Sequence, residues 1–311
     1  MKTFILTLLL IFSLSLSKAQ YWQQAVDYTM EVSLDAETAR YSGSQKLIYT
    51  NNSPETLKKV FYHQYFNAFQ PGSEMAVRLK NGADKNGRFK VVVDSLSSDQ
   101  QGFLRVSNLT QDGAAVITED SETILEVTLN TPLGPGESTT LELDFEGQVP
   151  DVVRRAGKNS SEGVAFSMAQ WYPKMAEYDL EGWNSDPYTG REFHGVWGNF
   201  DVKITLDKDF TVAASGYLQN AEDIGKGYSE RKRPKSKRGK LTWHFIAPMV
   251  HDFTWAADVD YIHDTYPGPN NVTLHFFYKN DPEIVENWKK LQPDTAKLMS
   301  YFNSKIGAYP Y

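Results

Sequence analysis

The chain has 311 residues, of which 41% are hydrophobic, and this is enough to form one large domain or two. It carries 32 basic and 39 acidic residues, and this acidic balance argues against nucleic acid as the main partner. The absence of cysteine excludes disulfides, thiolate metal sites and cysteine nucleophiles.

Residues 1–19 have the pattern of a secretory signal peptide. Lys2 is positive, residues 4–16 are apolar apart from Thr and Ser, and residues 17–19 offer a cleavage site before Gln20. The apolar core is too short for a comfortable membrane span, so we expect no transmembrane segment after cleavage; a retained anchor is the alternative. The mature chain would have 30 basic against 39 acidic residues, net −9 in place of −7, and would be secreted or periplasmic.

Short strands dominate residues 20–260, where helical periodicity is absent. The patterned stretches are residues 28–34, 41–50, 60–65, 125–129, 141–145 and 202–206. The first two are expected to form a hairpin, and residues 60–65, bulky on both faces, are expected to form a central strand. Many short strands of this kind are typical of an antiparallel sandwich or a barrel-like sheet.

A basic stretch interrupts this pattern, because eight of the twenty residues 221–240 are Lys or Arg. Such a run can bind polyanions. Strand patterns flank it on both sides, however, so we interpret it as a solvated hairpin loop.

Helical signals begin only near the C-terminus. A strand is expected over residues 271–278, and then Asp281 can cap a helix that has Pro282 at its first position. Pro293 is expected to end or kink this helix, and Asp294 can cap a second one.

Residues 166–197 read as a long ordered loop held by aromatic side chains, because no helical or strand period runs through them. One interpretation is a secreted module that binds glycan or protein through three stacking platforms, namely Trp171, Trp183 and Trp197. Another is a glycosidase that uses paired carboxylates from Asp179, Glu181 and Asp186.

The same region carries a family resemblance. Residues 169–174 (AQWYPK), 181–190 (EGWNSDPYTG) and 197–216 (WGNFDVKITLDKDFTVAASG) resemble the N-terminal region of the aminopeptidase N-like (gluzincin) zinc metallopeptidases. Further matches lie in the same order along the chain, at residues 41–43, 50–53, 133–138, 243, 251–256 and 306–311. Together they span nearly the whole mature chain.

The resemblance implies a mainly β fold in two parts. Residues 20–262 would form an antiparallel, curved, saddle-like β-sandwich domain. Residues 263–311 would be the α/β beginning of an incomplete thermolysin-like catalytic domain. The turn residues 264–271 lie beside this boundary.

Catalysis in this family needs an H-E-x-x-H zinc motif, whose Glu is the general base, and a G-x-M-E-N-type segment for the substrate amine. None of the six His residues is followed by Glu or by a second His four residues later, and no G-x-M-E-N-type segment occurs. In the family both motifs follow the stretch that here ends at Tyr311. We therefore expect the N-terminal portion of an exported zinc aminopeptidase, inactive alone, whose zinc and peptide substrates belong to the full-length protein.

One substrate-binding residue is still expected in this chain. The family's N-terminal domain supplies a Glu or Gln, just before the strand that ends in the W-Y-P-like segment, that holds the α-amine of the substrate. Plain spacing back from Pro173 falls near Val164, which cannot bind an ammonium group. Glu162 and Gln170 are the nearest candidates, because an acid suits an ammonium by its charge and an amide by its carbonyl oxygen. The pair His251-Asp252 suggests acid–base or metal chemistry, but neighbouring residues on a strand point to opposite faces and would not share a ligand.

Overall fold

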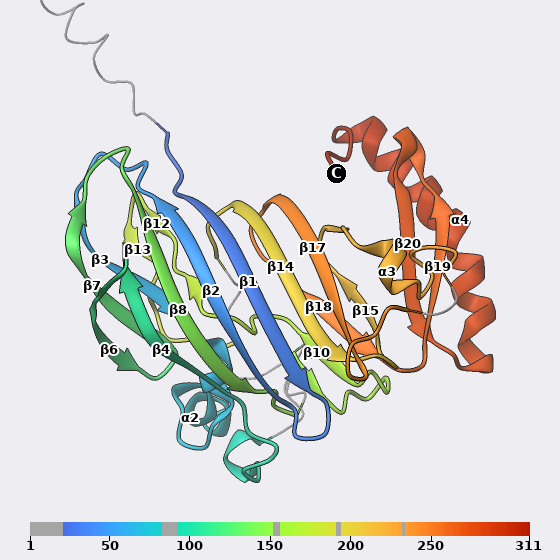
Figure 1. Ribbon diagram of the computed structural model, residues 1–311, viewed down its shortest axis with the longest axis horizontal. Helices are drawn as coiled ribbons and strands as arrows, with labels where there is room; N and C mark the ends of the chain where they lie inside the picture. Colours follow the sequence, from blue (N-terminus) through green and yellow to red (C-terminus); the bar gives the residue numbers. More distant parts are fainter. Residues whose placement is uncertain (1–20, 83–91, 152–155, 191–193, 232–233) are drawn as a thin grey trace, which may run out of the picture.

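The computed structural model describes residues 21–82, 92–151, 156–190, 194–231 and 234–311, and the expected signal peptide lies outside them. The molecule consists mainly of β-strands. One large sheet spans it, two four-stranded sheets lie against one face of the large sheet, and the β19–β20 pair stands with α4 beyond its β17 side (Figure 1). This arrangement confirms the predicted mainly β sandwich.

The large sheet has eight strands, in the order β16-β17-β14-β1-β2-β8-β4-β5. Their bounds are β1 Ala25–Asp35, β2 Arg40–Thr50, β4 Phe103–Gln111, β5 Ala114–Ala115, β8 Ser138–Gln148, β14 Gly198–Asp207, β16 Tyr217–Leu218 and β17 Lys240–Val250. β1 and β2 pair antiparallel along their whole length, which confirms the predicted hairpin. Alternate side chains of β1, from Val26 to Leu34, are buried in the core, as period-two patterning requires.

One pair in this sheet departs from the antiparallel prediction. β1 and β14 run parallel, with Val26 opposite Gly198. β14 enters the sheet only after the chain has built other sheets, so no tight turn forces an antiparallel pairing. The strands approach closely at Gly198, where a Cβ atom would lie 1.8 Å from the Val26 carbonyl oxygen. Glycine at this position therefore permits the parallel contact.

The smaller sheets complete the sandwich. Their strands are β15 Thr211–Ala214, β18 Trp255–Asp258, β10 Phe166–Met168 and β9 Gly157–Lys158 in one sheet, and β11 Lys174–Met175, β3 Leu57–His63, β7 Ile124–Leu133 and β6 Ile117–Ser121 in another. Two-stranded pairs form from β12 Tyr178–Asp179 with β13 Gly182–Trp183, and from β19 Tyr261–Pro267 with β20 Thr273–Lys279. β3 lies between β11 and β7, in agreement with the central strand predicted there.

Helices are few within the described residues. They are α2 Glu74–Lys80, α3 Ala221–Ile224, α4 Pro282–Lys305 and the 3₁₀ turns η1 Tyr65–Phe69, η2 Val93–Ser95 and η3 Pro269–Asn271. None of the helices in this part of the chain is both long enough and apolar enough to cross a bilayer. The basic stretch 221–240 joins β16 to β17, which pair with each other, so it is a hairpin connection as interpreted from the sequence.

α4 begins as the sequence predicts but does not end where it predicts. The Asp281 side chain accepts a hydrogen bond from Glu283 N, and Pro282 occupies the first turn. The helix then runs through Pro293 to Lys305 as one element, so the predicted break and second helix are wrong. Contacts with the β19–β20 hairpin hold the turns before Pro293: Trp288 stacks on Tyr278 at 5.3 Å between ring centroids. This packing offsets the backbone hydrogen bond that proline removes.

The C-terminal half of α4 exposes apolar side chains among charged ones, and we expect the chain to self-associate through them. Leu298 and Phe302 are 54% and 46% exposed, and contiguous apolar surface of this kind favours association. The double variant Leu298→Gln/Phe302→Gln should be more monomeric than the parent chain in sedimentation velocity.

A control is Ile117→Gln, which removes an even more exposed apolar side chain (75%) from β6 and should leave association unchanged. Limited proteolysis is expected to cut within residues 265–295 before it cuts the β-sandwich. A parent chain that stays monomeric at high concentration and resists cleavage through Tyr311 would contradict this expectation.

The segment that follows β10 is anchored to the inner face of the large sheet. Tyr41 OH donates to the Trp171 carbonyl at 2.7 Å, and Tyr28 OH accepts from Met175 N at 2.9 Å. All four side chains are buried. Because such a segment cannot shift without breaking buried hydrogen bonds, it provides a rigid frame for the residues described next.

Candidate functional site

The centre of the candidate site is the run of residues 170–175, which follows β10 and ends with β11. Trp171 and Tyr172 are fully buried, and Trp171 Nε1 donates to the Phe253 carbonyl at 3.1 Å. The predicted ordered loop is therefore present, although short strands divide it. Trp171, Tyr172 and Tyr188 of this loop belong to the core, whereas Trp197 is exposed.

Gln170 is held in an unusual conformation. Its backbone φ is +55°, in the left-handed region that costs energy for a residue with a side chain. The side chain is buried, and Nε2 donates to Asp252 Oδ2 at 3.2 Å. Strain of this kind persists only where the surroundings over-determine it, and it concentrates at functional sites.

Asp252 receives donors from several directions. Tyr172 OH lies 3.0 Å from Oδ1, and Phe253 N donates to the same oxygen at 2.9 Å. Lys174 Nζ lies 3.3 Å from Oδ2, beside the Gln170 amide. The Lys174 contact is an ion pair without the directed geometry of a hydrogen bond. These contacts join Gln170, Tyr172, Lys174 and Asp252 into one cluster, called the Asp252 cluster below.

Lys174 is a buried cation, with only 2% of its surface exposed. Burial lowers its pKa, and the neighbouring Asp252 carboxylate opposes that shift. Gly195 packs directly on the side chain: a Cβ atom there would lie 2.5 Å from Lys174 Cε. This pair was not predicted from the sequence, although a Lys between Pro173 and Met175, in a run that the fold buries, requires a counter-charge.

A second group of titratable residues lies beside this cluster, around a cavity of about 120 Å³. The cavity is lined by His63, Tyr65, Asn184, Asp186, Pro187, Tyr188, Thr189 and His194. Burial lowers the pKa of His63 to about 4, although its Nε2 is 3.0 Å from the Asn184 carbonyl oxygen. Burial, with the nearby Asp179 charge, raises the pKa of Glu177 to about 7. Histidines with a lowered pKa and carboxyls with a raised pKa are both common at functional sites.

The two predicted substrate-binding residues do not come together. Gln170 follows β10, in the Asp252 cluster, whereas Glu162 precedes β10 in an exposed turn. The Glu162 carboxylate accepts from the Ser161 hydroxyl at 2.7 Å. The strand β10 thus separates the two candidates, and only Gln170 is built into a buried polar network.

His251 and Asp252 face different surroundings, as the sequence argument expected. His251 is exposed and packs on Trp197, with ring centroids 5.2 Å apart, while Asp252 turns inward. No group of three or more His, Asp or Glu side chains that could hold a metal ion is present in the described ranges.

The alternative sites are used structurally. Trp171 is buried and cannot serve as a stacking platform, and Trp183 packs between Phe61 and Tyr178. Asp179, proposed as a glycosidase carboxylate, accepts from Glu181 N at 2.8 Å and from Asn184 Nδ2 at 2.9 Å. Those bonds hold the β12–β13 turn.

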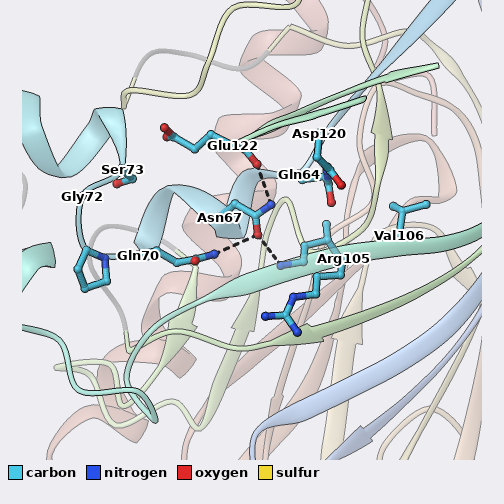
Figure 2. Close-up of a pocket in the computed structure, with 11 residues that line it drawn as sticks. Gln64, Asn67, Gln70, Gly72, Ser73, Arg105, Val106, Asp120 and Glu122 are labelled. Carbon is cyan, nitrogen blue, oxygen red and sulfur yellow. Dashed lines mark hydrogen bonds between the residues drawn. The ribbon is translucent and has the colours of Figure 1, made fainter. Parts of the chain in front are cut away.

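A larger open groove, of about 510 Å³, lies beside η1, α2 and β4 (Figure 2). Asn67 occupies its floor, where Nδ2 donates to the Glu122 carbonyl at 2.8 Å and Oδ1 accepts from Leu104 N at 2.8 Å. Gln64 Nε2 donates to Asp120 Oδ1 at 2.6 Å. These bonds among the lining residues hold η1 against β4 and β6.

Comparison with known proteins places the fold. No family model matches the sequence, and no curated protein matches it. Solved structures do match. The M1 zinc metallopeptidase from Deinococcus radiodurans is 19% identical, with a TM-score of 0.51, and the match covers 93% of this chain and 54% of that chain.

Two ligand-bound variants give the same result. A variant of that D. radiodurans enzyme bound to a Tyr-Ser-Ala substrate is 17% identical, with a TM-score of 0.51 and 55% of its chain covered. A two-domain M1 variant bound to L-tryptophan is 17% identical, with a TM-score of 0.52. The chain thus spans about half the length of the structures it matches. It has the fold of the amino-terminal region of the M1, aminopeptidase N-like, zinc metallopeptidases.

Proposed function

We propose that this chain is the amino-terminal portion of an exported, zinc-dependent aminopeptidase that removes N-terminal residues from peptides. In this proposal the 311 residues bind part of the substrate but do not catalyse by themselves. The fold and the ordered sequence motifs support the class of enzyme. The pattern of residues 1–19 supports export to the periplasm or the medium.

The observation that carries the proposal is the placement of Gln170. It is the candidate amine-binding residue that lies in a rigid, partly buried polar cluster, and its backbone strain is consistent with a functional role. Its carbonyl oxygen can accept a hydrogen bond from the α-ammonium group of a peptide. A hydrogen bond to a charged group contributes about 1.5–3 kcal/mol.

Zinc does not fit the residues of this chain. The sequence has no H-E-x-x-H, and within the described residues no cluster of three metal-binding side chains is present. We therefore assign the metal, and the activation of water that it supplies, to a catalytic domain outside these 311 residues. The role proposed for this chain is to bind and orient the amino end of the substrate.

Sequencing the gene beyond the codon for Tyr311 tests the proposal directly. The expected result is an open frame that encodes a G-x-M-E-N-type segment and then H-E-x-x-H. A stop codon immediately after Tyr311, with no such motifs in a neighbouring frame, would overturn the aminopeptidase assignment and favour a binding module.

The isolated chain is expected to bind no zinc stoichiometrically and to show no aminopeptidase activity, because it lacks the metal ligands. Metal analysis after dialysis and an aminoacyl-anilide assay measure the two properties. A complete M1 metallopeptidase treated in the same way is the positive control. One tightly held zinc per chain, or turnover above background, would contradict the prediction.

A further inference from the structure

The side chain of Gln170 has two chemically opposite ends, and the structure uses only one of them. Its Nε2 donates to Asp252 Oδ2 at 3.2 Å. No hydrogen bond to Oε1 is present among the described residues, and Oε1 is not one of the buried side-chain atoms that lack a partner. The carbonyl oxygen therefore has no protein partner among the described residues and is not fully enclosed, although the residue as a whole is buried.

An ionised carboxylate can only accept hydrogen bonds, so Asp252 determines which end of the amide faces it. We propose that Asp252 is a positioning residue that turns the Gln170 carboxamide so that Oε1, and not the NH₂ group, faces the substrate's α-ammonium. This inference rests on the proposed role of Gln170 in binding that ammonium. An amide turned the other way would present two N–H donors to a cation, which repels it.

Asp252 is itself fixed, which makes the orientation a property of the fold. Its Oδ1 accepts from Phe253 N at 2.9 Å and lies 3.0 Å from Tyr172 OH. These contacts leave Oδ2 for the Gln170 amide and for the Lys174 ammonium. Lys174 is buried beside Asp252, so the counter-charge of this carboxylate comes from a buried side chain and not from a surface residue.

The same geometry explains the choice of glutamine at this position. A glutamate in place of Gln170 would put a second carboxylate next to Asp252. Its oxygen would lie at about the 3.2 Å that now separates Gln170 Nε2 from Asp252 Oδ2. Two carboxylates that close repel each other, and one of them must take up a proton. With Asp252 in place, an outward-facing acceptor is therefore better supplied by an amide than by an acid.

The variant Asp252→Asn tests the inference in the 311-residue chain. The new side chain keeps an oxygen toward Phe253 N and Tyr172 OH and presents its NH₂ to Gln170, so the Gln170 amide is expected to turn over. In a chain labelled with ¹⁵N-glutamine, the Gln170 NH₂ signals should move upfield in ¹H and exchange faster with water. Gln170→Ala identifies these signals, and Tyr172→Phe, which removes a bond to Oδ1 only, should leave them in place.

Exchanging the acid and the amide between positions 170 and 252 is expected to restore peptide binding. The pair Gln170→Glu with Asp252→Asn restores an outward acceptor, because the new acid accepts from the new amide. Binding of the peptide Tyr-Ser-Ala, measured by chemical-shift titration against its N-acetylated form, is expected to weaken roughly tenfold in Asp252→Asn and to recover in the swapped pair. Where the loss of the Lys174 partner unfolds the single variant, Asp252→Asn with Lys174→Met keeps the cluster neutral.

The outcomes separate the positioning role of Asp252 from the substrate-binding role of Gln170. Unchanged Gln170 NH₂ signals in a folded Asp252→Asn chain would overturn the positioning role of Asp252. The Gln170 NH₂ signals could move as expected in Asp252→Asn while the parent chain binds the free and the acetylated peptide equally. That result would support the positioning role of Asp252 and contradict the assignment of Gln170 to substrate binding.

Discussion

Replacing Trp171 with alanine is expected to lower the free energy of unfolding by about 3–5 kcal/mol. The side chain is fully buried, and its ring lies within 6.4 Å of the rings of Tyr41, Tyr172 and Trp255. Removing it opens a cavity at the centre of the sandwich. It also leaves the Phe253 carbonyl without the indole donor at 3.1 Å.

Urea denaturation followed by circular dichroism measures this loss. Trp197→Ala is the matched control from the same loop, since Trp197 is 42% exposed and should cost less than about 1 kcal/mol. Equal destabilisation by the two substitutions would contradict the distinction between a core tryptophan and a surface one. Equally small losses for the two substitutions would revive the interpretation of this loop as a set of stacking platforms.

His63 is expected to make the protein acid-sensitive. Burial lowers its pKa from an ordinary value of 6.5 to about 4, so the unfolded chain binds a proton on His63 at a higher pH than the folded chain does. The stability that His63 contributes as a neutral group is therefore present above pH 6.5 and is lost as the pH falls from 6.5 toward 4. The shift corresponds to about 3 kcal/mol across that window.

Comparison of two unfolding curves isolates this effect. The difference in free energy of unfolding between the parent chain and His63→Gln should rise between pH 4 and pH 6.5 and be flat above. A difference curve is needed because Glu177, whose pKa is raised to about 7, contributes the opposite slope: its stability is lost as the pH rises through 7. A flat curve for His63→Gln would contradict the prediction.

The local patterns of this sequence determined its local structure. Alternation predicted the β1–β2 hairpin and the buried face of β14, because a strand shows its inward side chains every second residue. Capping chemistry predicted the start of α4 at Asp281 for a similar reason, since a cap acts within a few residues of itself. The motif order along the chain also predicted the M1-like fold that the solved structures show.

Pairing and helix continuity were decided by contacts that lie far apart in the sequence. The parallel pairing of β1 with β14 depends on how the intervening chain returns to the sheet, which no local pattern records. Pro293 predicted a break, yet α4 continues because its flanking turn is packed against the β19–β20 hairpin. Local propensity is a weak constraint once tertiary packing opposes it.

At the candidate site, too, the sequence determined one part and the tertiary structure decided the other. Sequence motifs singled out Gln170 and Glu162 as equivalent candidates, because both residue types can bind an ammonium. Only the fold separates them, by placing Gln170 against Asp252, 82 residues later in the chain, and leaving Glu162 in an exposed turn. The type of chemistry was thus encoded locally by residue identity. Which candidate lies in a buried polar cluster was decided by burial, charge pairing and hydrogen bonds between segments that meet only in the folded protein.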